Sequence, residues 1–257
     1  MTIKIGSLFA GIGGFELGLE RSIPNSETIW QVEQDKFCQK VLAKHWPNAK
    51  IYNDVREIKK DNVEYVDILC GGFPCQDISI AGKGEGIHDG KKSSFWWEMH
   101  RIISEIRPRV AVLENVSAIT FRGGLAVIGS LAQIGYDAAW IIISARDFGA
   151  PHRRDRWFCV AYPNSKRCEK EDRESIQSKF ERQGIWSMPI STTNNRSTTY
   201  TTGRGYWKTS HPEPLICRVD DGFSNRLDSP RIKALGNAIV PQCSEWIGKK
   251  IWESGIL

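Results

Sequence analysis

The sequence has no cysteine pair at Cys-x-x-Cys spacing and no cluster of cysteine and histidine at the spacing of a metal site. Its 257 residues nevertheless include seven cysteines and five histidines. An odd number of cysteines without paired spacing is typical of reduced thiols in a cytosolic protein, which argues against a disulfide framework and a structural zinc site. We therefore predict no metal ligand in this chain.

The sequence also lacks an apolar run long enough to span a bilayer. Residues 4–15 superficially resemble a signal peptide. Glu16, Glu20, the dense glycine and the missing small-residue cleavage site argue against one. We expect a cytoplasmic protein without a membrane partner. The net charge of +5 favours polyanionic partners only weakly.

Residues 1–162 alternate between strand and helix patterns. Strands are predicted at 3–9, 27–32, 50–52, 66–70, 110–113, 138–144 and 156–161, and helices at 14–21, 36–45, 95–106 and 125–134. Strands separated by helices indicate an α/β fold with a doubly wound, mostly parallel sheet. A chain of this length fits one large domain with a small insertion.

One thiol has a distinctive setting. Cys75 lies in the run Gly71-Gly-Phe-Pro-Cys-Gln-Asp77, directly after an apolar strand, so glycine and proline favour an exposed, fixed side chain. A thiol at that place is a candidate nucleophile, which needs activation because little of it is ionised at neutral pH. Glu114 ends another apolar strand, where partial desolvation is expected to raise its pKa, as suits a proton-donating acid. Cys38, Cys70 and Cys159 are predicted to be small core residues.

A glycine-rich turn follows the first predicted strand. Gly11, Gly13 and Gly14 open a helix, and Glu33 follows the second strand about 20 residues later, an arrangement typical of a nucleoside-bearing cofactor with its ribose bound to the acid. The turn is not Gly-x-Gly-x-x-Gly, so no pyrophosphate is indicated. Asp54 is interpreted either as an acceptor for an adenine amino group or as a cap of a helix or turn.

All these residues follow strands of one predicted parallel sheet, so they are expected at a single edge. The cluster Arg153-Arg-Asp-Arg156 precedes a strand and is either a solvated turn or a group that holds a carbonyl oxygen and phosphates. A cysteine hydrolase is disfavoured, because no oxyanion-type turn surrounds Cys75.

Taken together, these motifs resemble the DNA (cytosine-5) methyltransferase family. The resemblance covers residues 1–162 and 231–245 in the order of the family. The matching segments are Phe9-Ala-Gly-Ile-Gly-Gly-Phe15, Gly72-Phe-Pro-Cys-Gln76, Glu114-Asn-Val116, His152-Arg-Arg-Asp-Arg156 and Gly236-Asn-Ala-Ile-Val-Pro241. Two positions differ from the family pattern: Ser7 stands where aspartate is usual, and His152 where glutamine is usual.

The resemblance implies the fold of methyltransferases that depend on S-adenosylmethionine, and a role for each matched residue. The implied catalytic residues are Cys75, Glu114, Arg154 and Arg156. The implied cofactor ligands are Phe9, Gly11, Gly13, Gly14, Glu33, Asp54 and Asn237, and the implied substrate contacts are Gln76, Ser79 and Asn115. The implied reaction moves a methyl group to carbon 5 of a cytosine flipped out of DNA, through a covalent adduct with the cysteine.

The resemblance divides the chain into a catalytic domain, 1–162 with 231–257, and a short target-recognition region, 163–230. From composition alone, the polar run Ser191–Thr202 is equally a flexible linker or part of a DNA-contacting insertion. The expected partner is double-stranded DNA, with a cognate restriction endonuclease as a further candidate, and the expected state is a monomer. Two alternatives stay open: a tRNA cytosine-5 methyltransferase, and a non-catalytic DNA-binding relic of the fold.

Overall fold

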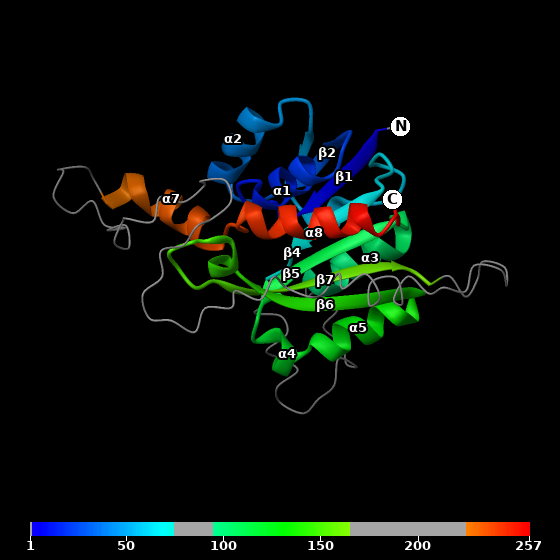
Figure 1. The fold of residues 1–257 in the computed structure, drawn as a ribbon. Helices are drawn as coiled ribbons and strands as arrows, with labels where there is room; N and C mark the ends of the chain where they lie inside the picture. The colour runs from blue at the N-terminus through cyan, green and yellow to red at the C-terminus, as the bar shows by residue number, and fades with distance from the viewer. Residues whose placement is uncertain (1, 75–94, 165–224) are drawn as a thin grey trace, which may run out of the picture.

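The computed structural model describes residues 2–74, 95–164 and 225–257 (Figure 1). The strands are β1 Ile3–Leu8, β2 Ser26–Val32, β3 Lys50–Tyr52, β4 Ile68–Gly72, β5 Val110–Val116, β6 Tyr136–Ser144 and β7 Asp155–Pro163. The α-helices are α1 Gly14–Ser22, α2 Lys36–His45, α3 Phe95–Ile106, α4 Ile119–Arg122, α5 Gly124–Gln133, α7 Asn225–Asn237 and α8 Pro241–Glu253. Two 3-10 helices are η1 Val55–Glu57 and η4 Ala145–Phe148.

The strands form one seven-stranded sheet in the order β3-β2-β1-β4-β5-β7-β6. The pairs β1/β2, β1/β4, β2/β3 and β4/β5 are parallel, whereas β7 is antiparallel to both β5 and β6. The prediction of a doubly wound, mostly parallel sheet is therefore confirmed. The chain order reverses between β1 and β4, and ligands of such sheets bind at the carboxyl ends of the strands beside this point.

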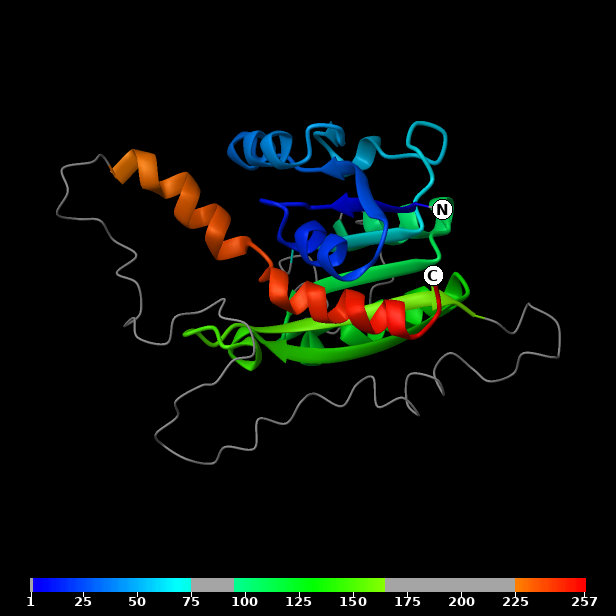
Figure 2. The same ribbon diagram turned by 45° about the horizontal axis from the view of Figure 1, so that its top comes forward.

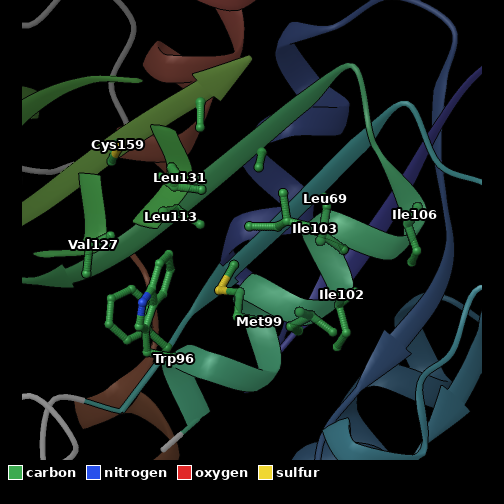
Figure 3. Close-up of a cluster of buried hydrophobic side chains, with 14 of the residues drawn as sticks. Leu69, Trp96, Met99, Ile102, Ile103, Ile106, Leu113, Val127, Leu131 and Cys159 are labelled. Carbon is green, nitrogen blue, oxygen red and sulfur yellow. The ribbon is translucent and has the colours of Figure 1, made fainter. Parts of the chain in front are cut away.

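Helices cover both faces of the sheet. On one face α3 and α5 pack against the strands through an apolar cluster that includes Trp96, Met99, Ile103 and Leu131 (Figure 3). The amphipathic spacing of α3 explains this, because its buried side chains recur at every third or fourth residue. On the other face α1 and α8 bury a second cluster. Each fully buried aliphatic side chain of this kind stabilises the fold by about 1.5–3 kcal/mol.

At the edge of the sheet that carries Glu114, strands β4 and β5 end later than the sequence predicts. β4 ends at Gly72 rather than at residue 70, and β5 continues to Val116 rather than ending at residue 113. Pairing causes the extension: Gly72 lies opposite Glu114, and β7 pairs with β5 from Ala111 to Val116. Glu114 is therefore a strand residue and not the first residue after the strand. The short helix α4 was also not predicted.

Residues 231–257 have a globular pattern, which predicts core positions at Ile232, Leu235, Ile239, Trp246, Ile247 and Ile251, and the outcomes are mixed. Ile247 and Ile251 are buried, and Ile239 and Trp246 pack half-buried against the second cluster. Leu235 is 63% exposed, so its prediction is wrong. Helix α7 projects away from the sheet (Figure 2). The side chain of Ile232 lies outside the described residues. The predicted core cysteines Cys38, Cys70 and Cys159 are buried, as expected.

Helices α1 and α8 approach closely because small residues separate them. The buried hydroxyl of Ser244 on α8 donates to the Gly14 carbonyl at 3.0 Å. A Cβ atom on Gly14 would lie 2.1 Å from the Ile239 carbonyl oxygen, and one on Gly18 would lie 2.0 Å from Ser244 Oγ. The C-terminal segment is thus packed directly behind the glycine-rich turn.

This packing yields a stability prediction. Gly14→Ala is expected to lower the free energy of unfolding by about 3 kcal/mol, because the clash is with backbone and overpacking costs about 1–3 kcal/mol or more. Gly129→Ala is the matched control, since Gly129 is at an exposed position of α5, where a Cβ would meet nothing within 4 Å. The control is expected to be neutral or to stabilise by about 0.5–1 kcal/mol. Urea unfolding measures both, and equal stabilities of the two variants would contradict the packing described.

Candidate active site

A cavity of about 720 Å³ opens at the edge of the sheet where the parallel strands end. β7 runs in the opposite direction, so it begins at this same edge, with Arg156 in register with Val116. The lining comes from the ends of β1, β2, β4 and β5, the starts of β7, α2 and α3, the 3-10 helix η1 and the end of α7: Phe9, Gly11, Val32, Glu33, Gln34, Asp35, Cys38, Val55, Gly72, Phe73, Pro74, Phe95, Glu114, Asn115, Val116, Arg154, Arg156, Lys233, Ala234, Gly236 and Asn237.

The glycine-rich turn forms one end of the cavity. Gly11 and Gly13 have φ angles of 58° and 87°, which glycine adopts without a steric penalty. Glu33 reaches the turn, since its Oε2 accepts from the Gly11 amide at 2.8 Å and its Oε1 accepts from the Asp35 amide at 2.8 Å. Each carboxylate oxygen has a second lone pair, so Glu33 keeps acceptor capacity for hydroxyl groups in the cavity.

Phe9 is held in a left-handed backbone conformation at the entrance of the turn, with φ of 56°. Such a conformation is uncommon for a bulky residue and indicates a functional or structural constraint. Its ring contacts that of Phe95 edge-on, with centroids 5.5 Å apart. The two rings together give this end of the cavity an apolar wall.

Glu114 forms the other end of the cavity. Its side chain is 12% exposed, and its Oε1 accepts from Arg156 Nε at 2.9 Å. Burial raises the pKa of Glu114 to about 7, and the nearby Arg156 and Arg154 guanidinium groups lower it, but by less than burial raises it. The raised pKa expected for Glu114 is therefore found. At neutral pH a large share of this acid is protonated and able to donate.

Asn115 and Arg154 form hydrogen bonds with other residues of the protein. The buried Asn115 donates from Nδ2 to the Phe73 carbonyl at 2.9 Å and accepts from the Val116 amide at 2.8 Å. Arg154 donates from Nη2 to the Ala238 carbonyl at 2.8 Å, 84 residues away, while its buried Nε has no partner among the described residues. Asn115 thus supports the backbone that leads to Cys75, and Arg154 holds the C-terminal segment at the cavity.

Three predicted cofactor ligands are not part of the cavity lining. Asp54 caps η1 by accepting from the Arg56 amide and forms an ion pair with the Arg56 guanidinium. Its neighbour Val55 lines the cavity instead. Gly13 and Gly14 belong to the turn but lie against Trp46 and Ile239 and not on the cavity. Asp54 thus has the capping contact that the sequence left open as one of its two interpretations.

Three predicted residues, Cys75, Gln76 and Ser79, lie outside the described residues, as does most of the predicted recognition region. Pro74, the last described residue before Cys75, lines the cavity. No group of three or more His, Cys, Asp or Glu side chains at metal-binding distance occurs in residues 2–74, 95–164 and 225–257. In these same ranges no helix combines the length and apolarity needed to cross a bilayer.

Sequence reasoning missed several lining residues, notably Asp35, Phe73 and Lys233. Lys233 on α7 reaches Asp35 at the start of α2, with Nζ 3.3 Å from Oδ2. Asp35 also caps α2, since it accepts from the amides of Phe37 and Cys38. The capping pattern of Asp35, only two residues after Glu33, could have indicated from the sequence that Asp35 lies near the cavity. Nothing in the sequence indicates that Lys233, almost 200 residues later, lies beside it.

The model of the family described as C-5 cytosine-specific DNA methylase matches residues 3–214. The chain belongs to this family. The Type II methyltransferase M.Bsp6I of Bacillus sp. is 35% identical over 170 residues, which are 63% of this chain and 53% of that protein. M.HhaI of Haemophilus parahaemolyticus is 32% identical over 161 residues, 61% of this chain and 48% of that protein. The chain thus spans about half the length of these curated relatives.

Solved structures of the same fold include the E260A/E261A/K263A mutant of Spodoptera frugiperda DNMT2. Its TM-score is 0.54 at 20% sequence identity, and the match covers 68% of this chain and 54% of the DNMT2 chain. The methyltransferase EhMeth of Entamoeba histolytica has a TM-score of 0.54 at 23% identity, with coverages of 70% and 60%. At these identities the likeness concerns the fold alone. The expected methyltransferase fold is therefore confirmed.

Members of this family use S-adenosylmethionine as methyl donor, and the cavity fits such a group. Its volume lies within the range of about 300–1,000 Å³ that is usual for small-molecule sites. Glu33 retains acceptor capacity towards ribose hydroxyls, and the rings of Phe9 and Phe95 offer an apolar surface to an adenine. Arg154 also lines the cavity, and its buried Nε has no hydrogen-bond partner among the described residues.

Proposed function

We propose that this chain transfers a methyl group to carbon 5 of a flipped-out cytosine in DNA, with S-adenosylmethionine as the methyl donor. The observation that carries this proposal is the position of Glu114. It is a largely buried acid with a pKa of about 7, paired with Arg156, in the same cavity as Glu33 and the glycine-rich turn. Family membership supports the same reaction.

The proposed chemistry assigns a distinct task to each end of the cavity. At one end Glu33, Phe9, Gly11 and Asn237 hold the cofactor, which supplies the methyl group when bound. At the other end protonated Glu114 donates to ring nitrogen 3 of the cytosine, while Arg156 fixes the orientation of the acid. The donated proton draws electron density from the ring, so carbon 6 becomes electrophilic.

Cys75 is the proposed nucleophile. Its thiolate adds to carbon 6, and the electron pair of the C5–C6 double bond makes carbon 5 nucleophilic towards the methyl group. Solvent water then takes the proton from carbon 5, the double bond forms again with expulsion of the thiolate, and ring nitrogen 3 returns its proton to Glu114. Asn115 contributes indirectly, since its bond to the Phe73 carbonyl fixes the backbone two residues before the thiol. The assignments of Cys75, Gln76 and Ser79 stay predictions.

Transfer of a radiolabelled methyl group tests the proposal. The full chain is incubated with labelled S-adenosylmethionine and either double-stranded DNA or tRNA, with Glu114→Gln as the control for background label. Label at carbon 5 of cytosine in DNA supports the proposal. Label in tRNA alone would establish the RNA methyltransferase alternative, and label in neither would establish the non-catalytic relic. A partner nuclease and the monomeric state stay predictions.

The two cavity arginines are expected to affect different kinetic constants. Arg156→Lys loses the Nε contact with Glu114, so kcat should fall roughly 10- to 100-fold with little change in the KM for S-adenosylmethionine. Arg154→Lys loosens the C-terminal segment at Ala238, so this KM should rise about tenfold, which corresponds to one hydrogen bond to a charged group. Steady-state kinetics at saturating DNA separate the two. Equal changes of the same constant in both variants would contradict these roles.

A further inference from the structure

A row of buried polar side chains lies behind the glycine-rich turn. Ser7 on β1 is in register with Gln31 on β2 and with Cys70 on β4. The three residues are at most 1% exposed, and Glu16 of α1, which is 0% exposed, belongs to the same group. Gln31 Nε2 donates to Glu16 Oε1 at 3.1 Å. Such groups are costly to bury, so a specific role is expected for them.

The bond between Glu16 and Gln31 is the second of two attachments that join the glycine-rich turn to the end of β2. At the start of the turn, the Gly11 amide donates to Glu33, and the Ala10 amide donates to the Val32 carbonyl at 3.0 Å. Past its end, Glu16 in the first turn of α1 is bonded to Gln31. The turn is therefore fixed on both sides to the end of β2. That end also carries Glu33, the proposed ribose ligand.

We propose that Glu16 is a positioning residue for S-adenosylmethionine, which holds the glycine-rich turn in its binding conformation as a neutral carboxylic acid bonded to Gln31. The inference rests on the proposed function, because it presumes that the cavity binds this cofactor. Glu16 itself does not line the cavity, so it acts through the position of α1 and not by contact with the ligand.

The complete burial of Glu16 favours the neutral form, because a buried carboxylate without a cation beside it is costly. Ser7 Oγ, Glu16 Oε2 and Gln31 Oε1 are buried, and none of them makes a hydrogen bond within the part of the chain that the structure describes. An ionised carboxylate would add only acceptors to this group, whereas a protonated Oε2 supplies a donor. Below its pKa, Glu16 therefore adds a second donor beside the Ser7 hydroxyl, and deprotonation leaves a charge in the core.

The electrostatic surroundings of Glu16 act in the same direction. Burial raises the pKa of Glu16 to about 7, and the charge of Glu20 on the same helix raises it further. The backbone amide of Glu16, the hydroxyl of Ser7 and the side-chain amide of Gln31 lower it, but by less than burial raises it, and no described cation contributes. Cys70 faces the group from β4 as a buried thiol. From α8 the buried titratable side chain is Cys243, which belongs to the other core cluster with Phe15.

The sign of the pH effect follows from the raised pKa. The unfolded chain loses the Glu16 proton near pH 4.5, whereas the folded chain keeps it to about pH 7. The Glu16 contribution to stability therefore falls between these values and is constant above them. Above about pH 7 the ionised side chain disfavours the buried position, so the turn is released and cofactor affinity decreases.

Calorimetric titration with S-adenosylmethionine at pH 6.0 and 8.5 tests the inference. For the unmodified protein the Kd should rise about tenfold between these values, since each unit above the pKa is worth at most a factor of ten. Glu16→Gln keeps the shape and a donor without a proton to lose, so its Kd should be the same at both values. Glu27→Gln, at an exposed glutamate of β2, is the matched control and should behave as the unmodified protein.

A second variant covers the case in which Glu16→Gln does not fold. Gln31→Met removes the partner amide at similar volume, and its Kd at pH 6.0 should match that of the unmodified protein at pH 8.5. Urea unfolding of the ligand-free proteins provides an independent readout, in which Glu16→Gln flattens the pH dependence. Identical pH profiles of Glu16→Gln and the unmodified protein would refute the positioning role alone. Absence of cofactor binding by the unmodified protein at every pH would refute the proposed function instead.

Discussion

Cys75→Ser is expected to abolish methyl transfer, with a loss of at least about a thousandfold, because a serine hydroxyl is ionised far less than a thiol and no base for it is proposed. The Kd for S-adenosylmethionine should stay unchanged, since the substitution leaves the proposed cofactor ligands Phe9, Gly11 and Glu33 as they are. Methyl transfer to DNA and calorimetric titration of the cofactor give the two readouts.

A trapping experiment makes the same test specific for covalent chemistry. Cytosine with fluorine at carbon 5 has no proton to lose there, so the adduct with the thiol cannot be resolved. The unmodified protein should form a stable complex with such DNA, visible in a denaturing gel, and Cys75→Ser should not. Cys159→Ala, at a buried thiol of β7, is the matched control and should still be trapped. Turnover by Cys75→Ser would dismiss this residue as the nucleophile.

Glu114→Gln is expected to lower kcat by about 100- to 10,000-fold, the usual contribution of a positioned general acid. Glutamine fills the same space and can still donate a hydrogen bond, but it has no proton to transfer to ring nitrogen 3. Glu105→Gln, at a partly exposed glutamate of α3 bonded to Arg101, is the matched control and should keep full activity.

The pH dependence of kcat provides a further check on Glu114. Because burial holds its pKa at about 7, the acid is protonated below that value, and kcat should fall about tenfold per pH unit above it. The measurement is made at saturating S-adenosylmethionine, because Glu16 is proposed to change the affinity for this cofactor and not kcat. In the Glu16→Gln background the fall in kcat should therefore persist. A kcat that stays constant from pH 6 to 9 would contradict the acid role of Glu114.

Local signals in the sequence were sufficient for several elements. Helix α2 and helix α3 have the predicted ends, because Asp35 caps the first and prolines follow both. The short strand β3 was also predicted to the residue. The convergence of Glu33, Glu114 and the glycine-rich turn on one cavity was predictable as well, since parallel strands bring their carboxyl ends to a common edge.

The sequence by itself therefore determined the family, the order of the elements and the residues at the sheet edge, since each depends on short-range pattern and spacing. Only the tertiary structure decided the contacts between residues distant in the chain. Examples are the hydrogen bond from Arg154 to Ala238, the close approach of Ile239 that leaves no space for a Cβ at Gly14, and the buried hydrogen bond between Gln31 and Glu16. Hydrophobic periodicity indicates which face of a helix or strand is buried, but not which residues pack against it. Those neighbouring residues determine the pKa of an acid and the contacts of an arginine.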